Sequence, residues 1–456
     1  MKSLIKHLLI NSPIYIPLVK YHHYHAKNEL KELLRQCENW TMEQTLEWQL
    51  QKVKQVVDYA FENVPFYNKL YTSVGFQKGD IKSWEDFHKL PLISKSDIKQ
   101  NLAAFTSPYT KTLNAHICHT GGSTDKPMEF FLDKATEIQE LAFFEYYWSK
   151  NGYNFGDKCV LLRGHHIAEI NNARFTLRDN TQHYLICDSR YISDVSAVKS
   201  IIRDINQFGA KVLQAYPSSA YLFAKSIIAL GLEAPHFDYI FLGSENTYDN
   251  QIEVIKEVFS AKEVLYHYGH SECAAVAIKY PEHKEMGFCP IYGITEFVNN
   301  GASKNPEIVA TGWNLSTPFI RYKTGDFAVV SDYTSSDYMQ NYQSVERIEG
   351  RLHEYIITPD LRKISLCNLA GAHCSSFSLI GDMQFEQNEV GKIIVYVTPP
   401  FEGAIVDDQT ISLLKTDMCQ TFSSDMAIDI QVVDQLRKTP IGKKILLFQH
   451  LDTNKY

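Results

Sequence analysis

Short apolar segments alternate with helical segments between residues 159 and 268, and this alternation restricts the fold more than any other feature of the sequence. The predicted strands cover residues 159–162, 184–187, 212–216, 239–242 and 264–268. Predicted helices lie between them at 219–230, with Ser218 as the N-cap, and at 250–259. Because a strand–helix–strand repeat leads to parallel strands covered by helices, the sequence predicts an α/β protein with a mainly parallel sheet.

The length of the chain and a change of pattern after residue 286 indicate two domains. A chain of 456 residues is too long for one compact core. Shorter predicted strands follow at 294–298, 307–310 and 327–330. A small α+β unit comes last, with a helix at 410–422 and strands at 392–398, 428–433 and 444–448. We therefore predict a large N-terminal domain over residues 1–350 and a small C-terminal domain over residues 351–456.

Capping residues predict two further helices. Thr41 and Gln44 form a capping box ahead of apolar residues at helical spacing. Asp133 is the predicted N-cap of a helix that extends to about residue 149. The aromatic run 143–148 in this second helix has helical spacing, so we expect it to lie in the core.

A segment rich in glycine and hydroxyl side chains, within residues 118–132, predicts a site for a polyphosphate. Two adjacent glycines allow successive N–H groups to point into one concavity and hold an anion, and the hydroxyls and a lysine add donors and positive charge. These residues are Thr120, Gly121, Gly122, Ser123, Thr124 and Lys126. No Walker P-loop and no G-x-G-x-x-G pattern occurs in the chain. The alternative is a surface turn rich in Gly, Ser and Thr.

Two predicted strands are each followed by a glycine and a carboxylate. Gly243, Ser244 and Glu245 follow the strand at 239–242. The next strand ends at Tyr268, and residues 268–272 have the sequence Tyr-Gly-His-Ser-Glu. Ligands bind at the carboxyl ends of parallel strands, where a carboxylate can hold a metal ion. The structural alternative for either turn is a helix cap.

Charge and cysteine content exclude some classes of protein and favour one compartment. The formal net charge is 45 − 53 = −8, which argues against a nucleic-acid-binding protein with a broad basic face. Nine cysteines without a C-x-x-C pair indicate free thiols in a reducing, cytoplasmic environment. The start of the chain lacks the continuous apolar span of a transmembrane helix. It is expected to pack on the domain surface, with weak contact to a membrane surface as the alternative.

The motifs of this chain, taken in order, resemble the signature motifs of the adenylate-forming superfamily, which includes acyl-CoA synthetases, nonribosomal adenylation domains and luciferase. The motifs are the loop at 118–132 and the segments 243–246, 268–272, 318–326, 347–353 and 439–444. Residues 64–71, 80–87 and 90–97 are similar to the phenylacetate–CoA ligase family. The loop at 120–124 together with residues 216–219 resembles its capsular-polysaccharide-biosynthesis branch. The resemblance covers almost the whole chain.

This resemblance implies a nucleotide site with roles for named residues. The loop residues Thr120 to Thr124, with Lys126, match the loop that wraps the β- and γ-phosphates of ATP. Ser244 and Glu245 match the segment that lines the adenine, and Tyr268 with Gly269 lies near the base. Ser271 lies near the α-phosphate, and Glu272 matches the Mg²⁺ ligand. Asp326 and Arg351 match the pair that holds the ribose hydroxyls. Lys443 matches the catalytic lysine of a mobile C-terminal domain, which reaches the α-phosphate during adenylation.

The function that the resemblance implies is ATP-dependent activation of a small carboxylic acid through an acyl-adenylate, followed by thioester formation with coenzyme A. Tyr216, Ser218 and Tyr268 are the predicted wall of the acid pocket. The first alternative is an AMP-forming ligase that transfers an acyl or amino-acid group to an envelope sugar or amine. The second is a nucleotide-binding relative without turnover. Asp125 and His353 favour this second alternative, because the family usually has glycine and Asp or Lys at these positions.

One further group of residues was weighed as a zinc site. His270, Cys273, His283 and Cys289 lie close together in the sequence. Their spacing is irregular, so unligated side chains are the favoured interpretation.

Overall fold

The computed structural model describes residues 15–120, 128–154, 156–165, 175–179, 183–189, 191–192, 194–245, 247, 249–279, 285–299, 305–330, 343–351, 355–366, 376, 379–401, 403–438, 445–452 and 455. For residues 15–25, 164–165, 350–351, 355, 363–365 and 421 it describes the backbone alone.

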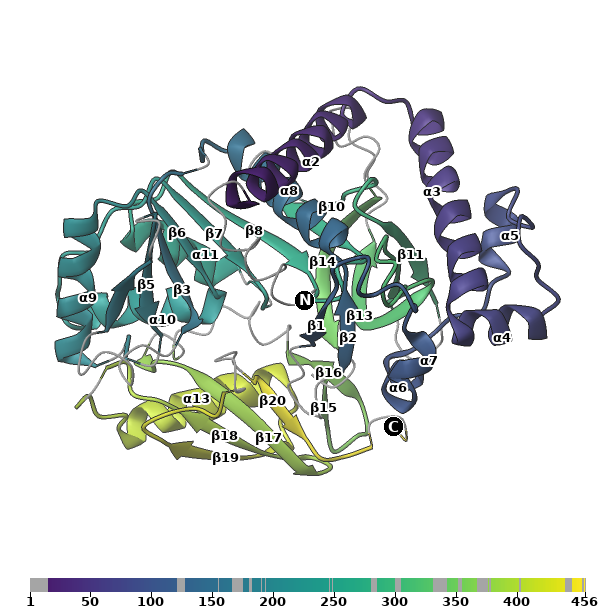
Figure 1. Ribbon diagram of the computed structural model, residues 1–456. Helices are drawn as coiled ribbons and strands as arrows, with labels where there is room; N and C mark the ends of the chain where they lie inside the picture. The colour runs from purple at the N-terminus through teal and green to yellow at the C-terminus, as the bar shows by residue number, and fades with distance from the viewer. Residues whose placement is uncertain are drawn as a thin grey trace, which may run out of the picture.

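One large sheet runs through the middle of these residues (Figure 1). It has twelve strands in the described part of the chain, in the order β11-β12-β13-β14-β10-β9-β8-β7-β6-β3-β5-β4. The neighbours β5, β3, β6, β7 and β8 are parallel, and the other neighbouring pairs are antiparallel. The strands are β3 (Cys159–His165), β4 (Thr176–Arg178), β5 (Tyr184–Asp188), β6 (Val212–Ala215), β7 (Tyr239–Gly243), β8 (Glu263–Gly269), β9 (Val276–Lys279), β10 (Met286–Phe288), β11 (Ile294–Val298), β12 (Glu307–Thr311), β13 (Tyr322–Val330) and β14 (Gln343–Arg351). The predicted α/β class and its parallel strands are therefore confirmed.

Helices cover both faces of the parallel strands because successive strand residues point to opposite faces. Ile240 and Leu242 of β7 belong to a core cluster with residues of the helices α9 (Val195–Phe208), α10 (Pro217–Ala229) and α11 (Asp249–Val258). Phe241 points to the other face and stacks on Trp148 of α8 (Lys134–Lys150), with ring centroids 4.8 Å apart. As predicted, Asp133 caps α8 and the aromatic run of α8 contributes buried residues.

The predicted cap of α10 is wrong. The structure places Tyr216 at the N-cap and Pro217 at the first helical position, and strand β6 ends one residue earlier than predicted, at Ala215. Proline is favoured at this position because it lacks the N–H that the first turn leaves without a partner, and its fixed φ suits the helix. Ser218 lies inside the helix, and its backbone N–H donates to the Glu245 carboxylate over 3.1 Å.

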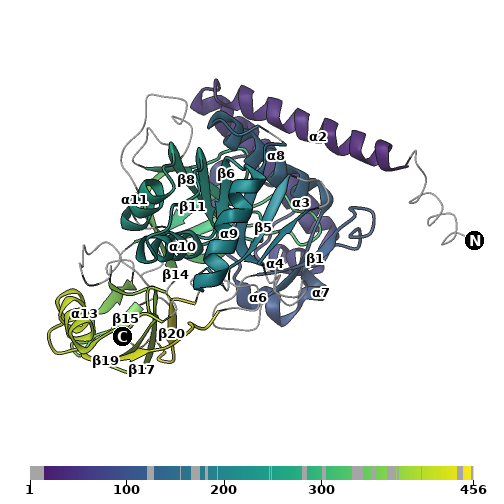
Figure 2. The ribbon, with the colours of Figure 1, turned by 90° about the vertical axis from the view of Figure 1, so that its left-hand side faces the viewer.

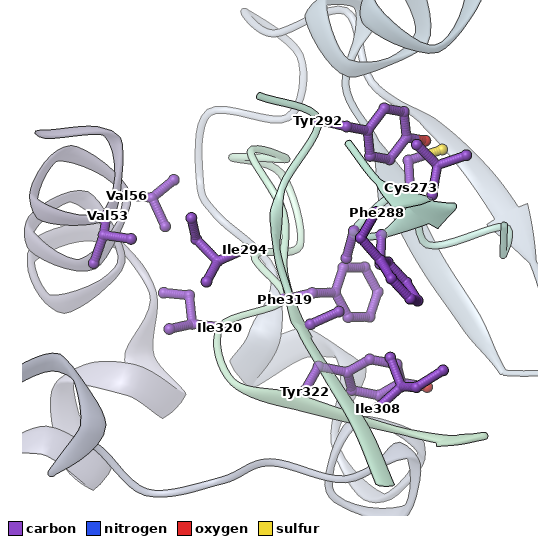
Figure 3. Close-up of a cluster of buried hydrophobic side chains, with 14 of the residues drawn as sticks. Val53, Val56, Cys273, Phe288, Tyr292, Ile294, Ile308, Phe319, Ile320 and Tyr322 are labelled. Carbon is purple, nitrogen blue, oxygen red and sulfur yellow. The ribbon is translucent and has the colours of Figure 1, made fainter. Parts of the chain in front are cut away.

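The N-terminal helices are α2 (Tyr15–Cys37), α3 (Met42–Asn63), α4 (Pro65–Ser73), α5 (Trp84–His88), α6 (Lys95–Gln100) and α7 (Leu102–Phe105). The predicted capping box at Thr41 is confirmed at the start of α3. In Figure 3, Val53 and Val56 of α3 point toward Ile294 of β11 and Ile320, which precedes β13, and all four are buried. These contacts attach the helices to the sheet.

Helix α2 lies against α8, where Lys27 and Lys31 pair with Glu145 at 2.6 and 2.5 Å. Figure 2 shows that its first turns extend beyond the body of the protein. Among the described helices, none combines the length and the apolar character that crossing a membrane requires.

A second core lies in the C-terminal part of the chain. Its sheet has the order β19-β18-β17-β20, and α13 (Asp408–Thr421) packs on it (Figure 1). The strands are β17 (Met383–Glu389), β18 (Lys392–Val397), β19 (Ala427–Val432) and β20 (Leu447–Gln449). The two-stranded sheet of β15 (Tyr355–Ile357) and β16 (Lys363–Ser365) is tied to this unit, since the Ile357 N–H donates to Gln387 Oε1 over 2.8 Å. The domain limits at residues 350 and 351 stay a prediction.

Helix α10 contacts the C-terminal unit. The Ser226 hydroxyl donates to the Pro400 carbonyl over 3.4 Å. The neighbouring Lys225 is only 7 % exposed, and its ammonium group lies 5.9 Å from the Tyr221 ring centroid. Burial lowers the pKa of Lys225 from 10.5 to about 8.

We expect the Lys225→Met variant to be more stable than the wild type at pH 7, by roughly 1–3 kcal/mol. The folded wild type has the lower lysine pKa, so the unfolded chain binds the extra proton between pH 8 and 10.5. Stability of the wild type should therefore rise across this window, and that rise should be absent in Lys225→Met. Denaturant unfolding at several pH values measures both effects. Lys199→Met, at an exposed position of α9, should keep the wild-type pH dependence, and an unchanged pH dependence in Lys225→Met would contradict the prediction.

Candidate functional site

The carboxyl ends of the parallel strands bring the predicted site residues together. Ser244 and Glu245 follow β7, Tyr216 follows β6, and Tyr268 and Gly269 end β8. Because β6, β7 and β8 are parallel neighbours, these ends lie at one edge of the sheet, where α/β proteins bind ligands.

Glu272 is a buried carboxylate at this edge. It lies in the turn between β8 and β9 and is 6 % exposed. The Tyr322 hydroxyl donates to its Oε1 over 2.9 Å, and His270 Nδ1 lies 3.2 Å from its Oε2. Burial alone would raise the pKa of Glu272, but the His270 imidazole and the Tyr322 hydroxyl outweigh burial and lower the pKa to about 2. The carboxylate is therefore ionised at neutral pH and chemically suited to bind a hard divalent cation.

Tyr268 and Asp326 form a second part of the site. The Tyr268 hydroxyl donates to Asp326 Oδ2 over 2.8 Å, and burial, with the Asp326 carboxylate, raises the pKa of Tyr268 well above its usual value. Asp326 lies on β13 directly opposite Arg351 of β14, so the predicted ribose pair is adjacent in backbone register. The side chain of Arg351 lies outside the described residues.

Ser244 and Glu245 are held by contacts across the strand ends. Ser244 has a φ of +71°, which a non-glycine residue rarely adopts, and its hydroxyl accepts a hydrogen bond from Arg163 Nη2 over 3.1 Å. The Glu245 carboxylate accepts the N–H of Ser218 at the start of α10. Glu245 thus has the helix-capping role that the sequence left as an alternative.

The hairpin strands β1 (His116–His119) and β2 (Glu129–Leu132) carry the glycine loop. Thr120 closes its base, because its N–H donates to the Met128 carbonyl over 2.9 Å and its hydroxyl accepts the Met128 N–H over 3.0 Å. The other predicted loop residues lie outside the described residues; they are Gly121, Gly122, Ser123, Thr124 and Lys126, with Asp125 among them. Lys443 and His353 also lie outside them, and their roles stay predictions.

The predicted residues Ser271 and Ser218 differ in exposure. Ser271 is exposed in the turn after β8, and Ser218 is half-buried beside Glu245. Of the four residues weighed as zinc ligands, His270 faces Glu272, Cys273 and Cys289 are buried, and His283 lies outside the described residues. In the part of the chain that the structure describes, no group of three or more His, Cys, Asp or Glu side chains could hold a metal ion.

Sequence reasoning missed three polar residues that the fold places near these strand ends. Arg163 lies on β3, two residues before its end, and its guanidinium lies over the Tyr216 ring, 5.7 Å from its centroid. His267 of β8 packs on Phe144 of α8 with ring centroids 4.5 Å apart. Glu140 of α8 accepts a hydrogen bond from the Tyr292 hydroxyl.

Gly243 explains how His267 fits at this edge of the sheet, and only the structure shows this relation. A Cβ atom at Gly243 would lie 2.3 Å from His267 Cε1. The absent side chain thus makes room for the imidazole above the sheet.

The chain is 25 % identical to Protein CapK of Staphylococcus aureus over 423 residues, which cover 92 % of this chain and 91 % of that protein. It is 36 % identical to the phenylacetate–coenzyme A ligase of Aromatoleum evansii over 81 residues, which cover 17 % and 18 % of the two chains. No family model matches the sequence.

Among solved structures, 2-hydroxyisobutyryl-CoA ligase in the postadenylation state, in complex with 2-HIB-AMP, superposes with a TM-score of 0.66 at 17 % identity. The superposition covers 90 % of each chain. The chain has the adenylate-forming fold. The resemblance to the adenylate-forming superfamily is confirmed, and the full-length similarity to Protein CapK agrees with the placement of the chain near the capsular branch.

The adenylate-forming fold of the same ligase superposes less well in other states. In complex with 2-HIB-AMP and CoA in the thioesterification state, the TM-score is 0.57. In the open conformation it is 0.53.

Proposed function

We propose that this protein is an AMP-forming ligase that activates a small carboxylic acid with ATP and then transfers the acyl group to a second substrate. The observation that carries this proposal is the juxtaposition of Tyr268 and Glu272, at the carboxyl end of the parallel strand β8, with Asp326 of β13. The buried Glu272 carboxylate is ionised and suited to a cation. Nearby, the Tyr268 hydroxyl is hydrogen-bonded to Asp326, whose carboxylate is suited to bind ribose hydroxyls. The adenylate-forming fold supports the assignment.

The nucleotide would lie along these residues. Tyr268 would pack near the base, Asp326 would accept hydrogen bonds from the ribose hydroxyls, and the backbone after β7 would line the adenine. Thr120 closes the base of the loop that is predicted to hold the phosphates. The residues present fit Mg²⁺ at Glu272, which would neutralise negative charge on the phosphates when bound.

The chemical step is the attack of the acid's carboxylate oxygen on the α-phosphorus of ATP, with pyrophosphate leaving. Both reactants are anions, so catalysis needs positive charge and amide donors at the reacting centre. Lys126 and Lys443 are the proposed lysines. Lys443 belongs to the small C-terminal domain, whose movement would open the site for the acceptor.

Coenzyme A is the first candidate acceptor, because the solved structures with this fold include a ligase in complex with CoA. A sugar or amine acceptor is the second candidate, and the resemblance of residues 120–124 and 216–219 to the capsular-polysaccharide-biosynthesis branch favours it. In either case the acceptor's nucleophile displaces AMP from the acyl-adenylate.

Pyrophosphate release with ATP and Mg²⁺, over a panel of carboxylic acids with and without coenzyme A, tests this function. We expect release that depends on the acid, and its dependence on coenzyme A separates a thioester ligase from an amide- or ester-forming ligase. Lys443→Ala should abolish release, and the neighbouring Lys444→Ala should retain it. Wild-type rates from Lys443→Ala would contradict the proposed role of the C-terminal domain. ATP binding without release for any acid would favour the non-catalytic alternative.

A further inference from the structure

We propose that the acid activated at this site carries a second carboxylate, and that Arg163 binds this second group. The inference rests on the proposed function and adds the class of substrate. It starts from a cation at the site that forms no ion pair with any of the described residues.

Arg163 is half-buried at the carboxyl end of β3, and its side chain extends across the end of β6. Its Nη2 donates to Ser244 Oγ over 3.1 Å, and its guanidinium lies over the Tyr216 ring. A guanidinium has five N–H donors. Within the described residues, the bond to Ser244 is the only hydrogen bond that Arg163 makes.

The carboxylates around the site are engaged with other groups. Glu140 accepts from the Tyr292 hydroxyl, Glu245 accepts from the start of α10, and Glu272 faces Tyr322 and His270. Among the described residues, no carboxylate forms an ion pair with Arg163. A half-buried guanidinium in this position is complementary to a planar anion, which it can bind through two parallel hydrogen bonds.

The neighbouring imidazole does not compete with Arg163 for an anion. Burial first, and the positive charge of Arg163 second, lower the pKa of His267 to about 3, so His267 is neutral. The Tyr216 ring, which the guanidinium covers, and the Phe144 ring, which contacts His267, add apolar groups next to these two side chains. This wall therefore combines one fixed positive charge with apolar area, which suits a short carbon chain that ends in a carboxylate.

An acid with a plain alkyl or aryl end would leave the guanidinium without an anion. Sites built to bind a polar group reject the analogue that lacks it far more strongly than apolar pockets discriminate by size. The same positive charge could instead bind a phosphate of the nucleotide, so the experiment has to separate these two sources of anion.

The experiment compares dicarboxylic acids with the monocarboxylic acids in which a methyl group replaces the far carboxylate. ATP–pyrophosphate exchange measures activation, and calorimetric titration measures binding of the acid and, separately, of ATP. We expect the wild type to prefer dicarboxylic acids and Arg163→Met to lower kcat/KM for them by about 10²-fold or more. We expect the loss for the monocarboxylic acids to be much smaller, limited to the effect of removing the bond to Ser244, and Arg163→Lys to restore part of the loss for the dicarboxylic acids.

Arg203→Met, at an exposed position of α9, is the matched control and should keep wild-type values throughout. Equal losses for both kinds of acid would overturn the inference, because Arg163 would then support the fold or, where ATP binding is weakened by the same factor, hold the nucleotide. Exchange with monocarboxylic acids alone would overturn it and leave the proposed function standing. Dicarboxylate binding that Arg163→Met abolishes, without exchange for any acid, would support the inference and overturn the proposed function. Absence of dicarboxylate binding to the wild type would overturn the inference.

Discussion

Replacing Arg321 by methionine is expected to destabilise the protein by about 3–5 kcal/mol, because breaking a buried ion pair leaves a charge without its partner. Arg321 is 8 % exposed. Its Nη2 lies 2.7 Å from Glu296 Oε1, and Nε lies 3.1 Å from Glu296 Oε2. Its Nη1 donates to the carbonyls of His88 and Leu90. One side chain thus joins β11 to the segment around α5, and methionine would leave Glu296 without its arginine and both carbonyls without this donor.

Denaturant unfolding of four proteins measures this effect. The wild type, Arg321→Met, Glu296→Leu and the double variant form a double-mutant cycle. The double variant should recover a large part of the loss, because it removes both charges together. A loss under about 1 kcal/mol in Arg321→Met would show that the ion pair contributes no more than an exposed one. A double variant as unstable as the sum of the two single variants would show that the charges do not interact.

Glu272→Gln is expected to lower the rate of adenylate formation by about 10²–10³-fold while leaving the fold intact. The amide keeps the shape of the side chain but carries no negative charge. In the wild type the Glu272 carboxyl group is ionised, because its pKa is lowered to about 2. A cation bound at the turn between β8 and β9 would then lose its carboxylate ligand from this turn. The Mg²⁺ dependence of ATP–pyrophosphate exchange measures the effect, and a higher Mg²⁺ requirement should accompany the lower rate.

Tyr322→Phe is the matched control for Glu272→Gln. It removes the hydroxyl that donates to Glu272 over 2.9 Å and keeps the carboxylate, so we expect a loss of stability of about 1 kcal/mol and a smaller effect on rate. Similar rates for Glu272→Gln and Tyr322→Phe, with an unchanged Mg²⁺ requirement, would mean that Glu272 supports the turn and does not hold a cation.

Local features of the sequence were sufficient for most elements of the fold. Periodicity and capping residues predicted α3, α8, α11 and the parallel strands, because each depends on residues within one segment. Strand β17 was missed because two of its buried positions are Gln384 and Gln387. Gln384 Nε2 donates to the Arg437 carbonyl over 2.9 Å and Gln387 Nε2 to the Ile357 carbonyl over 2.8 Å, and both carbonyls are distant in sequence.

The sequence by itself determined the α/β class, the resemblance to the adenylate-forming superfamily and the strand-end positions of Ser244, Tyr268 and Glu272. These follow from spacing within short segments. Only the tertiary structure decided that Tyr322 and His270 face Glu272, that Tyr268 bonds to Asp326, and that Glu245 caps α10. It also decided that Arg163 meets Ser244 across 81 positions of the chain. Such contacts depend on the order of strands in the sheet, which brings distant residues together and leaves no local pattern in the sequence.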